Sequence, residues 1–137
     1  MYYQPISMNK LFTVLLLAMT MIACNQSNDY KKNTNNPDLY AYTVHELNQV
    51  VMGNNFSPIV ASRNYAYAAI AGYEVVAAGD PTNYQSLAGQ LKGLTALPKP
   101  KDTANIDFPY AALVAYATVG QAVTFPEGSM QDYTDSL

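Results

Sequence analysis

The sequence predicts an all-α protein, organised as a partial bundle of about four helices. Three observations lead to this prediction. Apolar residues after residue 36 recur at steps of three and four, as on one face of an α-helix. Proline and glycine separate these periodic segments, as expected for the loops between helices. Charged residues make up 12% of the sequence, against about 25% in soluble domains, so too little of the chain is suited to face water.

The first predicted helix covers residues 37–53. Asn36 or Asp38 can cap it, Pro37 suits its first turn, and Gly53 ends it. Its expected buried face consists of apolar residues at helical spacing: Leu39, Tyr42, Leu47, Val50 and Val51.

The second predicted helix begins at Ser57 and Pro58 and ends near Gly79, before Asp80 and Pro81. The Ser57 side chain can accept a hydrogen bond from an unpaired amide of the first turn, and Pro58 stands where no donor is needed. The residues expected on its buried face are Ile59, Ala66, Ala69, Ile70, Tyr73 and Val76.

The remaining chain predicts two more helices. A shorter one is expected over residues 82–91, with one side formed by Tyr84, Leu87, Ala88 and Leu91. The prolines in residues 97–100 predict a stiff connector. The last clear helix opens at residues 107–109 and ends before Pro126, with its periodic residues at Leu113, Tyr116, Val119 and Val123. Residues 132–137 follow without a cap or a helix breaker, as if the chain were cut.

Two of these helices are apolar or small on nearly every side. Residues 66–71 and 111–117 place alanine or tyrosine on most helical faces. Helices of this kind normally lie buried within a larger body. The remaining chain can cover them only in part, so the sequence predicts an incomplete domain.

The amino-terminal segment has the pattern of an export signal. Lys10 precedes the apolar residues 11–23, a run that fits the roughly 7–15 residues of a secretory signal and falls short of the about 20 needed to span a bilayer. The box Met21-Ile22-Ala23-Cys24 resembles the site read by the bacterial lipoprotein signal peptidase. This resemblance implies that Cys24 is lipidated. An ordinary secretory signal with an incidental cysteine is the alternative.

The chain therefore divides into a lipoprotein signal peptide (1–23), a polar flexible tether (24–36) and a helical segment (37–137). Lipidated Cys24 would anchor the mature chain to a bacterial membrane in the cell envelope. The tether lacks the acidic run that marks surface export in some lipoproteins, which favours a periplasm-facing location. Cys24 is the sole cysteine, so neither a disulfide framework nor a cysteine-based zinc site is possible.

Residues 56–67, residues 84–100 and the helix opened by residues 107–109 resemble a known family. They are similar to the N-terminal region of exported lipoproteins in the vanadium-dependent haloperoxidase and type 2 phosphatidic acid phosphatase superfamily. The likeness covers most of residues 38–125. It implies a protein in which vanadate or a substrate phosphate is held by motifs of the form Lys-x6-Arg-Pro, Pro-Ser-Gly-His and Ser-Arg-x5-His-x3-Asp.

None of these three motifs is complete in this sequence. Ser62 and Arg63 begin like the third motif, but Ala69 stands where the histidine belongs. The family pattern uses two arginines and two histidines, whereas this chain has one arginine, Arg63, and one histidine, His45. The resemblance therefore implies an N-terminal fragment that is inactive alone. We predict no catalytic, cofactor or metal site in it, and vanadate only in a full-length haloperoxidase.

Two kinds of partner follow from this reading. The fragment would pack against a missing C-terminal catalytic half or a protein partner, and it would reach the membrane through Cys24. The alternative is a small self-contained lipoprotein that binds a protein or the envelope through its apolar, tyrosine-rich helices. A net charge of −3 and seven lysines and arginines leave no basic surface for nucleic acid.

His45 beside Glu46 suggests a general base oriented by a carboxylate. Adjacent helical residues point about 100° apart, so we expect a solvated histidine instead. Arg63 could clamp an anion through two hydrogen bonds, but we favour an ion pair with a carboxylate such as Glu74, or a contact with a neighbouring helix end.

Five tyrosines could stack on a ring or a sugar, but packing with hydroxyls on local partners is the favoured role of Tyr65, Tyr67, Tyr73, Tyr110 and Tyr116. Gly89 and Gly93 are isolated and do not form a phosphate-binding loop.

Overall fold

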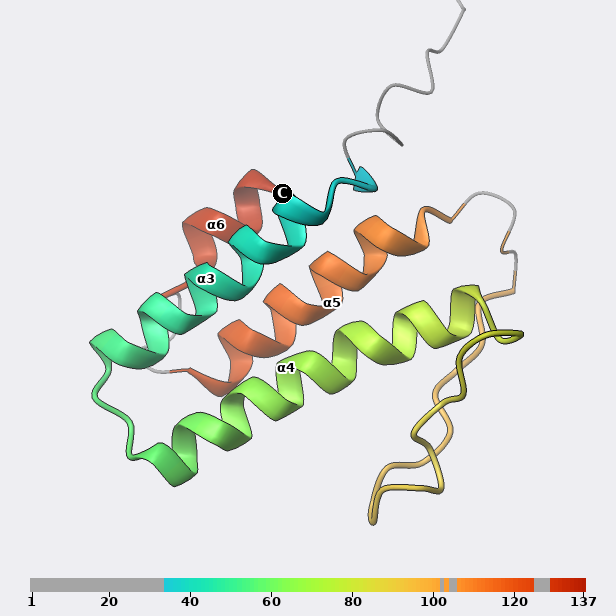
Figure 1. The fold of residues 1–137 in the computed structure, drawn as a ribbon, viewed down its shortest axis with the longest axis horizontal. Coiled ribbons are helices and arrows are strands. Elements are labelled where there is room, and N and C mark those ends of the chain that lie inside the picture. The colour runs from blue at the N-terminus through green and yellow to red at the C-terminus, as the bar shows by residue number, and fades with distance from the viewer. Residues whose placement is uncertain (1–33, 102, 104–105, 125–128) are drawn as a thin grey trace, which may run out of the picture. The chain divides into compact units, whose positions relative to one another are not determined.

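A computed structural model describes residues 34–101, 103, 106–124 and 129–137. In these residues the secondary structure consists of four helices, α3 to α6, with no strand (Figure 1). The all-α prediction is confirmed. The predicted signal peptide, Cys24 and the predicted tether up to residue 33 lie outside the described residues. None of the described helices is both long and apolar enough to cross a membrane.

Helix α3 runs from Pro37 to Gly53, as predicted. The Asn36 side chain caps it by accepting a 3.0 Å hydrogen bond from the Asp38 amide, which an amide at the start of a helix otherwise lacks. Its buried residues are Thr43, Leu47 and Val51. The prediction that Tyr42 is buried is wrong, since its side chain is 64% exposed. The side of α3 that faces the core is formed by Thr43, Leu47 and Val51, which are spaced four residues apart, and Tyr42 lies next to this side.

Helix α4 runs from Pro58 to Gly79, again as predicted. The expected side-chain cap at Ser57 is wrong, since its hydroxyl makes no cap hydrogen bond. Ser57 instead contributes its carbonyl oxygen, which accepts a 2.9 Å hydrogen bond from the Ala61 amide.

The buried face predicted for α4 is correct only in part: Ile70, Tyr73 and Val76 are half-buried, but the other three predicted residues are not buried. Ile59 is 72% exposed, and Ala66 and Ala69 are exposed as well. The side of α4 opposite Ile59 faces α5 with small residues, among them Ala68 and Gly72. A Cβ atom on Gly72 would lie 3.3 Å from the Ala112 carbonyl oxygen. Small residues thus let the two helix backbones approach closely, which larger apolar side chains would prevent.

Residues 82–91 do not form the predicted helix. They form turns at residues 82–83 and 89–90 and one isolated bridge between Ala88 and Leu91, and residues 84–87 are irregular. Two causes are visible. The Leu87 amide, which a helix would pair with a carbonyl four residues earlier, donates to a Glu74 carboxylate oxygen at 2.6 Å. Gly89 has a positive φ of 80°, a left-handed conformation that ends helical geometry. The connector at residues 97–100 contains neither helix nor strand.

Helix α5 runs from Phe108 to Val123. Asp107 caps it by accepting a 3.1 Å hydrogen bond from the Tyr110 amide. Its start and end agree with the prediction. The short helix α6, Gln131–Ser136, is not predicted by the sequence pattern. It includes most of residues 132–137, whose sequence contains neither a helix cap nor a helix breaker.

The helices pack around α5, which lies between α3 and α4 (Figure 1). The core cluster consists of Leu47, Val51, Ala68, Tyr116, Ala117 and Met130. At Gly120 an added Cβ atom would lie 3.1 Å from Leu47 Cδ1, so this glycine brings α5 against α3. The hydroxyls of Thr43 and Tyr133 are 2.7 Å apart and link α3 to α6.

Candidate functional site

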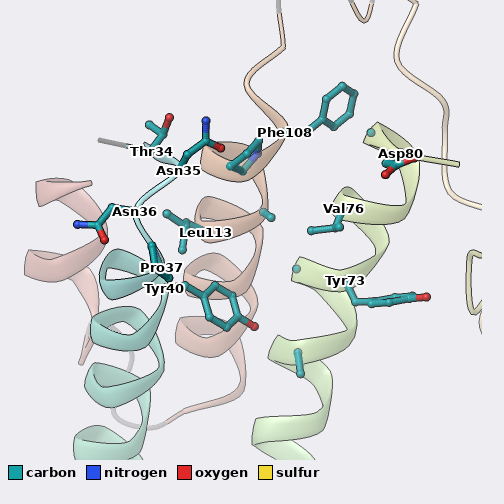
Figure 2. A pocket seen from close by; sticks show the side chains of 15 residues that line it. Thr34, Asn35, Asn36, Pro37, Tyr40, Tyr73, Val76, Asp80, Phe108 and Leu113 are labelled. Carbon is teal, nitrogen blue, oxygen red and sulfur yellow. The ribbon is translucent and has the colours of Figure 1, made fainter. Parts of the chain in front are cut away.

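A groove lies where the start of α3, the second half of α4 and the start of α5 meet (Figure 2). Its volume is about 520 Å³, within the range of roughly 300–1,000 Å³ typical of small-molecule sites. Apolar side chains form much of its lining, including Val76, Phe108 and Leu113. Tyr40 and Tyr73 line it from α3 and α4.

The groove depends on two glycines of α4. Gly72 allows the close approach to α5 described above. At Gly79 a Cβ atom would lie 2.5 Å from Phe108 Cγ and 2.8 Å from Phe108 Cβ. The Phe108 side chain therefore occupies the space that any larger residue at position 79 would need. This end of the groove has its shape because residue 79 is a glycine, which leaves room for the Phe108 ring.

The two carboxylates beside the groove already have partners within the chain. Asp107 accepts hydrogen bonds from the Thr34 hydroxyl at 2.8 Å and from the Tyr110 amide. Asp80 accepts from the Asn83 amide nitrogen and from its side chain. These carboxylates serve as helix and turn caps. They are therefore not set up as the acid and base of a reaction.

Two tyrosines near the groove form an aromatic pair. The rings of Tyr40 and Tyr116 pack edge to face, with centroids 5.7 Å apart. Burial raises the pKa of Tyr40. Burial, with smaller contributions from Tyr40 and Tyr65, raises the pKa of Tyr116 to about 12. Both phenols therefore remain neutral at physiological pH and act through packing.

A second hollow, of about 870 Å³, lies between α4 and the loop after it. Its lining includes Glu74, Tyr84, Leu97 and Lys99. Glu74 is 4% exposed, and its carboxylate accepts hydrogen bonds from the Ser86 hydroxyl at 2.7 Å and the Leu87 amide at 2.6 Å. The buried charge is thus used to hold the loop on the helix.

The structure separates the residues that the sequence singled out for chemistry. His45 is exposed on α3, as expected for a solvated helical histidine, and Arg63 is exposed on α4. Neither residue lines the groove. Among the described residues, no group of three or more histidine, cysteine, aspartate or glutamate side chains could hold a metal ion.

The predicted ion pair between Arg63 and Glu74 is wrong. The two residues are separated by about 16 Å along the helix axis, at 1.5 Å per residue. Glu74 is instead bound to the loop, and Arg63 forms no ion pair with any residue in the described part of the chain. The packing role of the tyrosines is confirmed for three of them. Tyr65 donates to Asn48 Oδ1 at 2.7 Å, Tyr73 donates to the Gln85 carbonyl at 2.9 Å, and Tyr116 lies in the core.

Two polar residues have roles, and a third has a buried position, that the sequence did not indicate. Glu74 anchors a loop, and Asp80 caps a turn. Asn64 is 5% exposed, and its side-chain nitrogen is buried without a hydrogen-bond partner in the described residues. A lone glutamate in an alanine-rich helix carries no local signal of such a role, because its partners, Ser86 and Leu87, lie in the loop after the helix.

No protein-family model matches this sequence, and no curated protein matches it either. Among solved structures, the comparison supports a haloperoxidase-like fold. The matching structure is described as the crystal structure of the first bacterial vanadium-dependent iodoperoxidase. It shares 41% sequence identity with this chain, with a TM-score of 0.68 over 73% of the chain. The chain spans 24% of the length of that iodoperoxidase.

The side chains described here do not fit a vanadate site. The resemblance implies two arginines and two histidines around one oxyanion. His45 and Arg63 stand on different helices, both exposed to solvent.

Proposed function

We propose that this chain is the N-terminal helical segment of an exported, lipid-anchored haloperoxidase-like protein, and that it is inactive by itself. The observation that carries the proposal is the match to the iodoperoxidase: 41% identity over 73% of this chain, but over 24% of that structure. Such a match is expected when one structural segment of a larger fold is compared with the whole.

The oxyanion site belongs, in this proposal, to the part of the fold that the chain does not span. A tetrahedral anion requires several cationic and imidazole groups around it, and this sequence contains one arginine and one histidine. The segment itself acts as a scaffold: α5 forms its centre, and α4 presents a further surface for packing. Cys24 attaches the protein to the membrane, on the periplasmic side of the cell envelope.

A chimera tests the proposal about activity. The full chain would be joined to the three quarters of the iodoperoxidase that it does not span, and compared with the chain alone. We expect the chimera to bind vanadate and to oxidise iodide with peroxide, and the chain alone to do neither. Tight vanadate binding or iodide oxidation by the chain alone would overturn the proposal. A folded chimera that binds no vanadate would count against the relationship to the haloperoxidases.

Fatty-acid labelling in a bacterial host tests the anchor. Cells that express the full chain would be grown with a labelled fatty acid, and Cys24→Ser would serve as the matched control. We expect label on the wild-type chain and none on the variant. Equal labelling of the two proteins would contradict lipidation at Cys24.

One observation favours the alternative of a self-contained lipoprotein that binds a protein or the envelope. Helix α6 is preceded by Met130, which is 1% exposed and belongs to the core cluster with Leu47 and Ala117. The last residues thus help to close the core. A monomeric chain with one cooperative melting transition would support this alternative. Aggregation, or compact structure without cooperative melting, would favour the segment of a larger domain.

A further inference from the structure

A continuous line of residues follows the side of α4 that faces away from α5. We call it the outer stripe, and it consists of Ile59, Arg63, Ala66, Ile70, Glu74 and Ala77. Their steps of four and three residues place them on one side of a helix. Ala68 and Gly72, which pack towards α5, lie on the opposite side. The outer stripe is apolar except for Arg63 and Glu74.

The chain itself covers one half of the outer stripe. Glu74 and Ala77 are each 4% exposed, and the loop after α4 is attached there through Ser86 and Leu87. Figure 1 shows this loop, in yellow, on the side of α4 away from α5. The other half, from Ile59 to Ile70, is more open to solvent: Ile59 is 72% exposed, Arg63 and Ala66 are exposed, and Ile70 is half-buried.

We propose that the open half of the outer stripe, from Ile59 to Ile70, is the surface on which the catalytic part of the haloperoxidase-like protein packs. This inference rests on the proposed function. Continuity supports it, because the same line of residues is already covered further along α4. The comparison supplies the occupant: the similar iodoperoxidase has three quarters of its chain beyond the part that is matched here.

Arg63 sets the chemistry of the contact. It is the one charged residue in the open half, and it forms no ion pair with the part of the chain that the structure describes. A guanidinium that is covered by a partner needs hydrogen-bond acceptors opposite it, and a carboxylate suits it best; we therefore expect an aspartate or glutamate of the catalytic part at this point. A second copy of the chain fits less well. A two-fold contact centred on the stripe would bring the two Arg63 side chains together.

Cysteine labelling tests whether the open half is covered. Ala66→Cys and Ala41→Cys would each be made in the full chain with Cys24→Ser, so that each protein has a single thiol. Both alanines are exposed and helical, but Ala41 lies on α3. Each variant would be labelled with a maleimide, first as the chain alone and then in the chimera with the iodoperoxidase.

We expect labelling at position 66 to be fast in the chain alone and slower by about tenfold or more in the chimera, since a covered residue reacts only after local opening. Position 41 should react at the same rate in both. A chimera that melts cooperatively but leaves position 66 as reactive as in the chain alone would overturn the inference, as would equal protection at both positions. Protection at position 66 in the chain alone would show that a second copy covers the stripe.

Labelling does not require activity, so these outcomes are separate from vanadate binding. A chimera that binds vanadate but leaves position 66 reactive would show that the catalytic part does not pack on the open half of the outer stripe. The proposed function would still stand.

Discussion

The hydroxyl of Tyr65 on α4 donates a 2.7 Å hydrogen bond to the side-chain oxygen of Asn48 on α3. Helix α5 lies between these two helices over the rest of their length (Figure 1). Both side chains are half-buried, so the bond is partly shielded from water. It gives α4 a polar tie to α3 in addition to the shared core.

Replacing Tyr65 by phenylalanine removes this bond and keeps the ring. We expect Tyr65→Phe to lower the free energy of unfolding by about 0.5–1.5 kcal/mol, the net contribution of one hydrogen bond. Urea denaturation measures the change. Tyr67→Phe is the matched control, because Tyr67 is 50% exposed on the same helix, and it should change stability little. Equal losses in the two variants would argue against a specific role for the bond.

Replacing Glu74 by alanine leaves the Ser86 hydroxyl and the Leu87 amide without their acceptor. We expect Glu74→Ala to cost about 1–3 kcal/mol of stability, because it removes two part-buried hydrogen bonds that each contribute about 0.5–1.5 kcal/mol. Hydrogen exchange at the Leu87 amide should become faster, since the loop is released from α4. Glu46→Ala on α3 is the control, with an effect within about 0.5 kcal/mol. Unchanged exchange at Leu87 would contradict the anchoring role.

Adding a methyl group at Gly79 forces a rearrangement. The new Cβ atom would lie 2.5 Å from Phe108 Cγ, so Phe108 must move. We expect Gly79→Ala to destabilise the protein by about 1–3 kcal/mol, as overpacking usually does. Gly53→Ala is the control, because nothing lies within 4 Å of its Cβ position, and alanine suits a helix better than glycine. Thermal melting of the two variants should therefore shift in different directions, or only for Gly79→Ala.

The stability of the protein should fall at alkaline pH. The pKa of Tyr116 rises from 10.0 to about 12 in the folded protein, chiefly through burial. Below pH 10 both states keep the proton; between pH about 10 and about 12 the unfolded state loses it first. The contribution of Tyr116 is therefore lost as pH rises through this window. Urea unfolding across this range should show a shallower fall for Tyr116→Phe. If stability falls equally in the wild-type protein and in Tyr116→Phe, ionisation of Tyr116 does not cause the loss.

The helix ends could be predicted from the sequence because the residues that set them act locally. Asn36, Asp107 and the prolines after caps begin helices through bonds and angles within one turn, and Gly53 and Gly79 end them. The rotation of α4 about its own axis, which decides the side that faces α5, could not be predicted. Apolar residues lie on both sides of this helix, so periodicity alone does not decide which side faces α5.

The loop at residues 82–91 shows the same limit. Its sequence has helical spacing, but Glu74 takes the Leu87 amide and Gly89 adopts a left-handed conformation. The sequence pattern also did not indicate the candidate groove. It arises where the ends of three helices meet, and its shape depends on the space left at Gly72 and Gly79.

The sequence by itself determined the helical class, the start and end of α3, α4 and α5, and the scarcity of residues that could hold an anion. Each of these depends on composition or on contacts within a few residues. Only the tertiary structure decided that the small side of α4 packs on α5 and that Ile59 and Arg63 remain outside. Packing of two helices depends on how closely both backbones can approach, and that distance is a property of the pair.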